Sequence, residues 1–597
     1  PGNLIFRLLI SIAALGIVNY FLISFILPGL YQPLQNAGLS ASLTSMVVYM
    51  PATLLLFTPA FSMGGILPVA GNLLIRSDKG LASLLGKIYA WETLGSTLGG
   101  LATGFLLIGT LGQRMTIFVA VLINLALAVY FLLTKSKEFH QNTNPEIPVE
   151  SAKQTGKKNK STTADTQAIN SRVSLAATFT FGFAVIGLQV VWIRILRIYL
   201  TNTSYTFSLI ASMVILGLFA GSWFYMKRGD KFRNDSSTML KLLLMTSLAV
   251  VVGFLILLRL PELIMFPMAA KQDAYFLRII VIPVISSLLV IIPVTFISGY
   301  AFPLACSLYT RSYRDVSGSI GKVLLWNTAG SVIGPLMAAY LLIPLLGSGL
   351  AVLFFPMILL VISFFIVQKI SAIRKTGFLK PIIAVAGSII LLILVVRPEV
   401  YILPPSFSRF EKKILDYHES VEGTYVVGEE TSGRNTVLST YVNNSAVIGS
   451  SYDAVKVVKM VGHLPFFAGL QVKNALVVGF GIGVTTSAIA SDPGVEAIDC
   501  IELVSGLKDA AHYYSGLNNN IQNDKRLKIR TGDGRHFLQS SNKKYDLISS
   551  DPTHPILGSG NLYTKEYFEL CKAHLNSGGM VSQYLPLHKL LPADFQG

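Results

Sequence analysis

The sequence predicts an α-helical membrane domain with an internal duplication, followed by an α/β domain built on a parallel sheet. Hydrophobic residues make up 52% of the 597-residue chain and charged residues only 13%, about half the charged share of an ordinary soluble protein. Apolar runs of about 20 residues, the length of a membrane helix, recur through the first two thirds. The last third has soluble composition, and strand patterns alternate there with helix patterns.

The formal net charge is +17, from 48 Lys and Arg against 31 Asp and Glu. In membrane proteins Lys and Arg collect in cytoplasmic loops and fix the topology. Here the loops that are rich in them are 76–87, 135–172, 227–237, 311–322 and 369–380. We therefore expect the lipid bilayer as a partner and no nucleic acid. The 3 cysteines form neither a disulfide framework nor a zinc pattern, so no metal is expected.

A repeat supports the duplication. The segment "GKIYAWETLGSTLGG" (86–100) returns as "GKVLLWNTAGSVIGP" (321–335), with Gly, Lys, Trp, Thr and Ser at matching places. The same offset pairs Gly112 with Gly347. Chance does not keep one ungapped register over such a length, and many transporter folds are internal duplications.

The apolar runs define candidate helices. In the first half they are 4–30, 44–75, 86–111 and 115–134, and in the second half 174–200, 205–226, 238–258, 276–310, 321–345 and 349–368. The first half has no counterpart of the first two helices of the second half. We therefore expect two more helices upstream of Pro1 and a six-plus-six arrangement. A further apolar run, 381–396, is marginal for a membrane span.

The expected domains follow from these patterns. They are a first membrane half (1–134, incomplete at its N-terminus), a disordered linker (135–172), a second membrane half (173–368), a connector with an extra apolar helix (369–397), a small β subdomain with a helix (398–470) and a Rossmann-like domain (471–597). The β subdomain rests on the hairpin pattern of 423–449, and its helix is expected to end near Gly462. The sheet is expected to continue beyond Gly597.

One acid stands out in the membrane part. Glu92 lies within a predicted membrane helix, and its repeat mate is the uncharged Asn327. A carboxylate inside the membrane is a functional candidate by default. The alternative is that Glu92 lies near the interface and pairs with Lys87 or with one of the expected upstream helices.

The stretch "LVVGFGIGVTT" joins an apolar run to three glycines, Gly479, Gly481 and Gly483. Glycines allow a tight turn after a strand and let a ligand approach the backbone. Such a motif alone is also typical of plain turns.

Acidic residues follow the next strands of the same domain. "AIDCIEL" contains Glu502, "LKIRTGDGRHFL" leads to Asp533, and "YDLISSDPTHP" leads to Asp551, while a fifth strand lies between Gly578 and His588. The carboxyl ends of parallel strands meet at one edge of a doubly wound sheet, where ligands bind. A carboxylate at the spacing of Glu502 suits the two ribose hydroxyls of a nucleoside.

The order of the glycine turn, "IEL", "GDGR", "YDLISSDPTHP", "LYTKEYF" and "SGGMVSQYLPLH" resembles the spermidine synthases, or polyamine aminopropyltransferases. It is most similar to membrane-fused members, in which such a domain follows a duplicated, transporter-like (major-facilitator-like) helical region. The resemblance implies a Rossmann-like, S-adenosylmethionine-dependent transferase domain. The implied donor is decarboxylated S-adenosylmethionine or S-adenosylmethionine, with no metal.

The resemblance also assigns roles to residues. It places Glu502 on the ribose, Asp533 and Gly534 on the adenine side, and Asp551 beside the acceptor amine, whose proton it accepts or relays. Sulfonium is a good leaving group, so catalysis can rest mainly on positioning. His554 is a candidate base with an ordinary pKa near neutrality, or else a cap of its loop.

Several positions depart from the family pattern. Ile482 occupies the place of an acid that faces the donor's amino group, and His554 that of a second aspartate. Before the retained His463, residues 457–459 read Val-Val-Lys instead of Tyr-His-Glu. A polyamine is a multiply charged cation and needs carboxylates. These departures therefore point to an acceptor that is less cationic, an amine or a membrane-borne small molecule.

We expect a membrane-anchored, spermidine synthase-like transferase of the bacterial inner membrane that transfers an aminopropyl group. Methyl transfer to a membrane-associated substrate is one alternative. A polyamine transporter, or a non-catalytic membrane subunit with a degenerate Rossmann domain, is another. The soluble domain is expected in the cytoplasm, or outside it if 381–396 spans the membrane. A homo-oligomer and a larger membrane complex both stay open.

Overall fold

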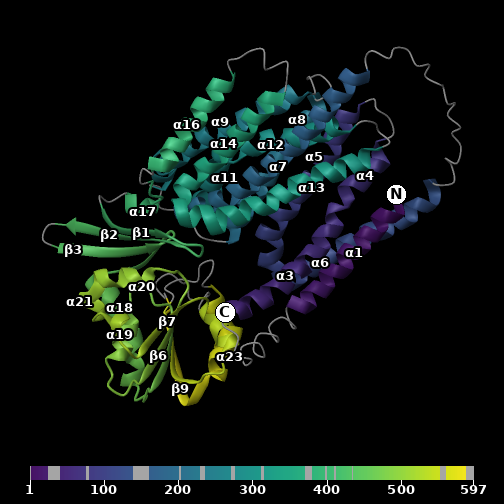
Figure 1. Ribbon diagram of the computed structural model, residues 1–597. Coiled ribbons are helices and arrows are strands. Elements are labelled where there is room, and N and C mark those ends of the chain that lie inside the picture. The colour runs from purple at the N-terminus through teal and green to yellow at the C-terminus, as the bar shows by residue number, and fades with distance from the viewer. Residues whose placement is uncertain are drawn as a thin grey trace. The chain divides into compact units, whose positions relative to one another are not determined.

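A computed structural model gives the fold (Figure 1). It describes residues 2–23, 41–75, 80–138, 160–200, 204–228, 235–269, 276–310, 315–369, 379–396, 400–408, 412–432, 435–551 and 560–585. The chain divides into two compact units. The helical unit comprises residues 1–26, 49–195 and 205–400, and the C-terminal unit comprises 401–597 with two short segments, 27–48 and 196–204.

The first two thirds of the chain are helical. The α-helices are α1 (Gly2–Phe21), α3 (Ala41–Gly64), α4 (Ile66–Leu74), α5 (Leu81–Ala102), α6 (Ile108–Glu138), α7 (Lys160–Tyr199), α8 (Ser204–Arg228), α9 (Ser236–Leu260), α10 (Phe266–Ala269), α11 (Ile282–Val290), α12 (Ile292–Tyr309), α13 (Val316–Met337), α14 (Ile343–Lys369) and α16 (Leu379–Val396). Short π-helical turns interrupt them at η2 (Thr103–Leu107), η3 (Pro261–Met265), η4 (Leu277–Val281) and η6 (Ala338–Leu342). Among the described residues, 9 helical segments are long and apolar enough to cross a membrane.

The repeat in the sequence is matched in the backbone. Helix α5 leads through η2 into α6, and α13 leads through η6 into α14, and the boundaries from the start of α5 to the start of α6 are all shifted by the offset that separates the two sequence segments. Both α6 and α14 kink at a glycine in the left-handed region, Gly112 with φ 72° and Gly347 with φ 76°. Two π-helical turns and two kinks at equivalent places show that matching sequences dictate matching local geometry.

Some predicted helix limits were wrong. The run 44–75 is broken at Gly65 into α3 and α4. The run 276–310 is divided into η4, α11 and α12, since Pro293 supplies no backbone N–H to a continuous helix. Both ends of the linker predicted at 135–172 are helical, because α6 runs to Glu138 and α7 begins at Lys160. Residues 139–159 lie outside the described part of the chain.

The C-terminal unit begins with α17 (Pro405–Ser408) and an antiparallel sheet. Its strands are β1 (Lys413–Glu419), β2 (Thr424–Ser432), β3 (Asn435–Val442) and β4 (Ser445–Gly449), in the order β1-β2-β3-β4. The hairpin pattern predicted at 423–449 is present, with one further strand in front of it. The turn between β3 and β4 contains Asn443 at φ 52°, a conformation that asparagine tolerates.

Helix α18 (Tyr452–Phe467) passes the predicted end at Gly462 and contains Pro465. A proline cannot donate to the carbonyl four residues earlier, here that of Val461. The hydroxyl of Ser582 donates to this carbonyl oxygen instead, at 2.9 Å. A partner from a distant strand therefore satisfies the carbonyl that the proline leaves without its helical hydrogen bond.

A five-stranded parallel sheet follows, in the order β7-β6-β5-β8-β9. The strands are β5 (Asn474–Val478), β6 (Ala497–Glu502), β7 (Leu527–Thr531), β8 (Tyr545–Ser550) and β9 (Leu575–Gln583). In β5, Ala475 and Val477 belong to one apolar cluster, and Leu476 and Val478 to another. Both faces of the sheet are therefore buried, as in other doubly wound sheets, and the predicted parallel sheet is confirmed.

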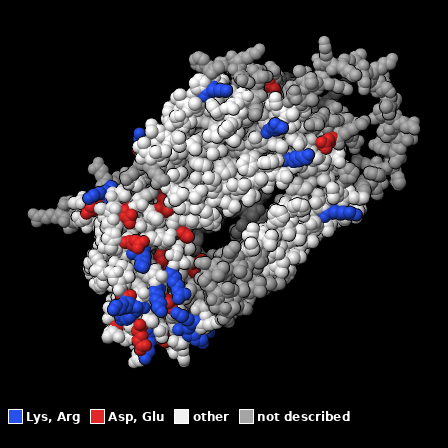
Figure 2. Space-filling view, viewed as in Figure 1, with Lys and Arg blue, Asp and Glu red and all other residues white. Residues whose placement is uncertain are grey.

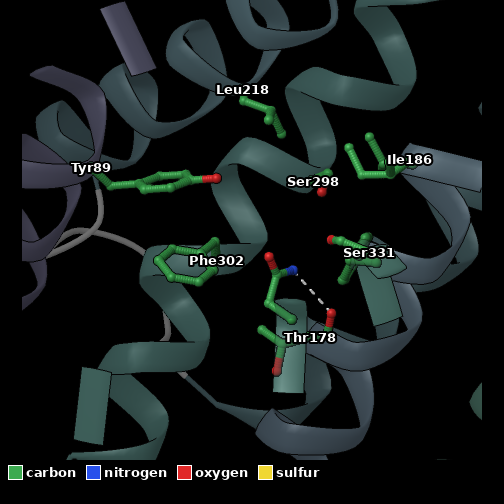
Figure 3. A pocket seen from close by; sticks show the side chains of 11 residues that line it. Tyr89, Thr178, Ile186, Leu218, Ser298, Phe302 and Ser331 are labelled. Carbon is green, nitrogen blue, oxygen red and sulfur yellow. Dashed lines mark hydrogen bonds between the residues drawn. The ribbon is translucent and has the colours of Figure 1, made fainter. Parts of the chain in front are cut away.

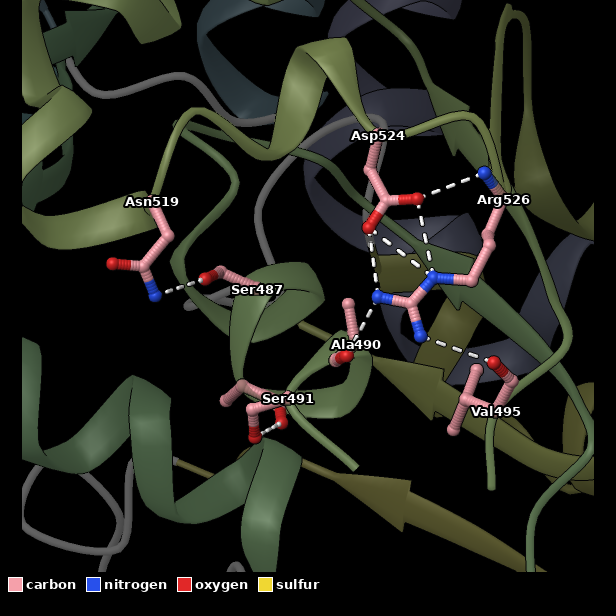
Figure 4. A network of polar contacts seen from close by, with 8 residues as sticks. Ser487, Ala490, Ser491, Val495, Asn519, Asp524 and Arg526 are labelled. Atoms are coloured by element: carbon pink, nitrogen blue, oxygen red, sulfur yellow. Dashed lines mark hydrogen bonds and ion pairs between the residues drawn. The ribbon is translucent and has the colours of Figure 1, made fainter. Parts of the chain in front are cut away.

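The connections of this sheet contain α19 (Val484–Ala490), α20 (Leu507–Ala510), α21 (Ser515–Asn518), α22 (Gly534–Ser540) and α23 (Lys565–Ala573). A polar network fixes the end of α19 (Figure 4). Arg526 donates to the carbonyl oxygens of Ala490 at 2.8 Å and Val495 at 3.0 Å, and its guanidinium pairs with Asp524 at 2.8 Å. Helix α19 is thus anchored at its carboxyl end, while its first turn faces the strand ends described next.

Candidate active site

The glycine turn follows β5 directly. Gly479, Gly481 and Gly483 all have positive φ, at 92°, 54° and 82°. A β-carbon on Gly483 would lie 2.7 Å from Ile521 and 2.9 Å from Phe480, so both the conformation and the space require glycine there. The backbone N–H of Gly483 donates to the carbonyl of Phe480 at 2.8 Å, which closes the turn immediately before α19.

Glu502, the last residue of β6, lies under this turn. Its Oε2 accepts hydrogen bonds from the N–H groups of Phe480 at 2.8 Å and Gly481 at 3.0 Å, and its Oε1 accepts one from Val504 at 2.9 Å. Burial raises the pKa of this carboxyl, and backbone donors of Val504, Gly481, Phe480 and Leu503 oppose that rise. These donors hold the carboxylate in place beneath the glycine turn.

Asp533 and Gly534 lie where β7 passes into α22. Asp533 is the N-cap of α22, and its Oδ1 accepts from the N–H of His536 at 3.0 Å. Gly534 is buried, and a β-carbon there would overlap the side chain of Val478 in β5. The close approach of α22 to the sheet therefore depends on this glycine, and it places Asp533 at the strand edge.

Asp551 follows β8, and its backbone N–H donates to the carbonyl of Val478 at 3.0 Å. Its Oδ2 accepts a hydrogen bond from the hydroxyl of Thr485. Its Oδ1 is enclosed and has no hydrogen-bond partner among the described residues. Burial raises the pKa of Asp551 to about 7, and the Thr485 bond opposes the rise. A carboxyl of this kind can take up a proton near neutral pH.

The structure brings together the site residues of the C-terminal unit. The glycines, Glu502, Asp533, Gly534 and Asp551 occupy the carboxyl ends of four neighbouring parallel strands. Sequence reasoning missed Thr485. Its signal was the hydroxyl two residues after the last glycine of "GFGIGVTT", in the first turn of the helix. His554 lies outside the described residues.

Ile482 points away from polar surroundings. Its side chain is 1% exposed and belongs to an apolar cluster with Val455, Val458 and Val484. Its carbonyl oxygen accepts from Asn518 at 2.7 Å. Ile482, one of the positions at which this chain departs from the family pattern, is thus part of the core that joins α18 to the first turn of α19.

Glu92 and Asn327 lie in the helical unit, on α5 and α13. Glu92 is exposed in the described structure, and its backbone carbonyl accepts from Ser96. Asn327 donates through Nδ2 to the carbonyl of Thr178 at 3.1 Å and lines a cavity. The two repeat mates therefore have different surroundings.

The parallel sheet, the glycine turn and the acids at its carboxyl edge define a Rossmann-like α/β domain, a fold whose ligands bind at this edge of the sheet. Residues 455–585 match the family model for the spermine/spermidine synthase domain. The polyamine aminopropyltransferase of Serratia proteamaculans is 32% identical over 123 residues, which cover 20% of this chain and 43% of that protein. That of Clostridium beijerinckii is 33% identical over 126 residues, covering 21% and 44%. The chain thus spans less than half the length of these relatives.

Two solved structures are also similar to this chain. One is a spermidine synthase in complex with the transition-state analogue AdoDATO, at 22% identity and a TM-score of 0.26, covering 29% of this chain and 57% of that one. The other is the spermidine synthase from Thermotoga maritima, at 21% identity and a TM-score of 0.26, covering 29% and 56%.

Proposed function

We propose that the C-terminal unit is an aminopropyltransferase that uses an S-adenosyl-type donor and an amine acceptor. The observation that carries the proposal is the position of Asp551. It is a carboxyl with one oxygen held by Thr485 and the other without a described partner, at the same sheet edge as the glycine turn and Glu502. The family model that matches residues 455–585 supports the same class of reaction.

Each residue of the site has its own proposed role. Glu502 accepts a ribose hydroxyl of decarboxylated S-adenosylmethionine, and Asp533 lies on the adenine side. The acceptor nitrogen attacks the aminopropyl carbon that is bonded to sulfur. The bond between this carbon and sulfur breaks with its electron pair going to sulfur, which leaves a neutral thioether. The nitrogen loses a proton, which the ionised Oδ1 of Asp551 accepts. With a pKa of about 7, Asp551 is ionised in much of the enzyme at neutral pH.

The test is product analysis with the full chain purified in detergent. Decarboxylated S-adenosylmethionine and 1,4-diaminobutane are supplied, and formation of methylthioadenosine together with an aminopropylated amine is expected. Asp551→Asn should abolish the product, whereas Asp509→Asn, at an exposed acid of α20, should not. Absence of both products, with donor binding shown separately by calorimetry, would contradict aminopropyl transfer.

Methyl transfer is the second candidate, and the surroundings of Ile482 favour it. An apolar cluster at this turn cannot stabilise the ammonium of an aminopropyl group. With S-adenosylmethionine as donor, the methyl carbon is attacked and S-adenosylhomocysteine is released. The same assay separates the two reactions, because methylthioadenosine and S-adenosylhomocysteine are distinct in mass.

The helical unit is proposed to be a duplicated membrane domain that anchors the transferase. On the face shown in Figure 2, its surface is almost free of charged side chains, whereas Lys, Arg, Asp and Glu crowd the C-terminal unit. Large apolar side chains are exposed on several of its helices, among them Phe61 (73%), Leu122 (63%), Leu248 (64%) and Val395 (69%). In water such a surface would favour aggregation, and a bilayer covers it.

We place this anchor in a bacterial inner membrane, with the C-terminal unit in the cytoplasm, where S-adenosyl donors are made. Helix α16 has 18 residues, slightly fewer than the about 20 of a typical span. A phosphatase or fluorescent-protein reporter fused after Gly597 tests on which side of the membrane the C-terminal unit lies. Reporter activity outside the cytoplasm would place this unit where no S-adenosyl donor is supplied, and would contradict the enzymatic proposal. The mass of the protein in detergent separately tests whether it forms a homo-oligomer or a larger complex.

A further inference from the structure

A small, partly open cavity lies inside the helical unit, far along the chain from the transferase site (Figure 3). Five helices line it: α5, α7, α8, α12 and α13. They include one helix of the first half, α5, and the equivalent helix of the second half, α13. Sites between repeated halves are common in duplicated helical proteins.

Three hydroxyl groups point into this cavity. Figure 3 shows those of Tyr89, Ser298 and Ser331 directed toward the same empty space. None of the three has a hydrogen-bond partner among the described residues; Ser298 is buried (7% exposed), and Tyr89 and Ser331 are half-buried. Buried hydroxyls are normally paired, so a polar ligand in the cavity would give Ser298 a partner.

Asn327 adds an acceptor to this group. Its Nδ2 donates to the carbonyl oxygen of Thr178 at 3.1 Å, and that bond settles the orientation of the amide, since a carbonyl cannot donate. Oδ1 and the second N–H of the amide are therefore left for a ligand. Oδ1 accepts a hydrogen bond, so a ligand that carries a donor suits it.

The surroundings favour a positively charged donor. The aromatic rings of Tyr89 and Phe302 are stacked with centroids 4.3 Å apart, so their inner faces cover each other and the outer, electron-rich faces are the ones that can attract a cation. Glu92 does not line the cavity but lies one helical turn beyond Tyr89 on α5, and among the described residues that line it there is no Lys, Arg or His. The remaining wall is apolar, with Val185 and Leu218 as examples.

We propose that this cavity binds the ammonium group of a small primary amine. The ammonium has three donors, which suit Oδ1 of Asn327 and the hydroxyls of Ser298 and Ser331, and its short carbon chain lies against the apolar wall. Gly182 allows α7 and α13 to approach closely beside the cavity, because a β-carbon there would overlap the backbone carbonyl of Asn327 and lie 2.8 Å from Oγ of Ser331. The site is separate from the proposed transferase site and would exist without catalysis.

The probe is ethylammonium, and its binding to the full chain in detergent is followed by saturation-transfer NMR. The experiment uses the Asp551→Asn background, so that an amine site in the C-terminal unit does not contribute. For three heavy atoms we expect a Kd on the order of 1 mM. Ethanol, which has the same shape without the charge, is expected to bind at least about tenfold more weakly, since hydrogen bonds from a charged donor are stronger than those from a neutral one.

Two variants and a matched control locate the site. Ser331→Ala removes a hydroxyl that has no hydrogen-bond partner among the described residues, so the fold should be unchanged while affinity falls about tenfold. Glu92→Gln should weaken ethylammonium binding and leave ethanol unaffected. The control is Ser96→Ala, at the repeat mate of Ser331, where the hydroxyl donates to the carbonyl of Glu92 at 3.0 Å outside the cavity. Equal affinity in Ser331→Ala and Ser96→Ala, equal binding of ethanol, or no saturable signal each overturns the proposal.

Discussion

The hydroxyl of Thr485 donates a hydrogen bond to Oδ2 of Asp551, and this bond joins the first turn of α19 to the end of β8. The same hydroxyl oxygen lies 3.1 Å from the carbonyl oxygen of Val458 in α18. A hydroxyl has one hydrogen, so it serves one acceptor at a time. When Asp551 is ionised, the carboxylate takes this hydrogen. When Asp551 is protonated, it can donate to Thr485, whose hydrogen then turns to Val458.

Thr485→Val should therefore raise the pKa of Asp551 above its value of about 7, because the carboxylate loses its only described donor. A general base acts in its ionised form, so the rate of the parent protein should rise with pH through the pKa of Asp551. In Thr485→Val this rise should occur at higher pH. For a shift of about one unit, activity at pH 7 falls about fivefold and recovers at pH 9. The measurement is a pH–rate profile of kcat/KM. Thr486→Val is the matched control, since Thr486 is equally buried and makes no bond to Asp551.

Asp551 should also make the C-terminal unit less stable at high pH. Its folded pKa, about 7, is above the ordinary aspartate value, so its protonated form stabilises the fold at low pH and this contribution is lost as pH rises through 7. Asp551→Asn should match the parent protein near pH 4 and be more stable at pH 9. Hydrogen exchange of β5 and β8 measures this in the full chain. Faster exchange in Asp551→Asn at pH 9 would contradict the burial argument.

Glu502 is expected to be structural as well as ligand-binding. Glu502→Gln turns one acceptor into an NH₂ group, which must then face the backbone N–H of Phe480, Gly481 or Val504. A buried donor left without an acceptor costs about 1–3 kcal/mol. Hydrogen exchange should show weaker protection of β6, and calorimetry should show weaker binding of an S-adenosyl donor. Glu496→Gln is the control, because its pair with Lys473 is exposed and worth at most about 1 kcal/mol.

The sequence predicts the parallel sheet and its edge residues well, because burial on both faces and glycine turns leave local patterns. It predicts long-range partners poorly. The end of α18 was misplaced at Gly462, since nothing local shows that Ser582 would supply the hydrogen bond that Pro465 cannot. The bond between Thr485 and Asp551 joins residues far apart in the chain in the same way. The burial of Ile482 depends on α18 packing over the turn, which its own motif does not encode.

Asp533 allows its two roles to be separated. Asparagine caps a helix about as well as aspartate, whereas loss of an N-cap costs about 1 kcal/mol. Asp533→Asn should therefore keep α22 stable while weakening donor binding. Asp533→Ala should both destabilise α22 and weaken donor binding. Donor calorimetry together with hydrogen exchange of α22 tests this pair of variants. Unchanged donor affinity in Asp533→Asn would mean that the role of Asp533 is limited to capping α22 through its bond with the N–H of His536.

The repeat mates Gly334 and Gly99 should respond differently to the same substitution. A β-carbon on Gly334 would overlap the backbone carbonyl of Phe183 in α7, whereas one on Gly99 meets no heavy atom within 4 Å. Overpacking against a backbone costs about 1–3 kcal/mol, while alanine in an open helix position gains up to about 1 kcal/mol over glycine. Gly334→Ala should thus lower the thermal midpoint in detergent, and Gly99→Ala should leave it unchanged or raise it. Equal shifts in the two variants would mean that α5 and α13 are packed alike in the protein.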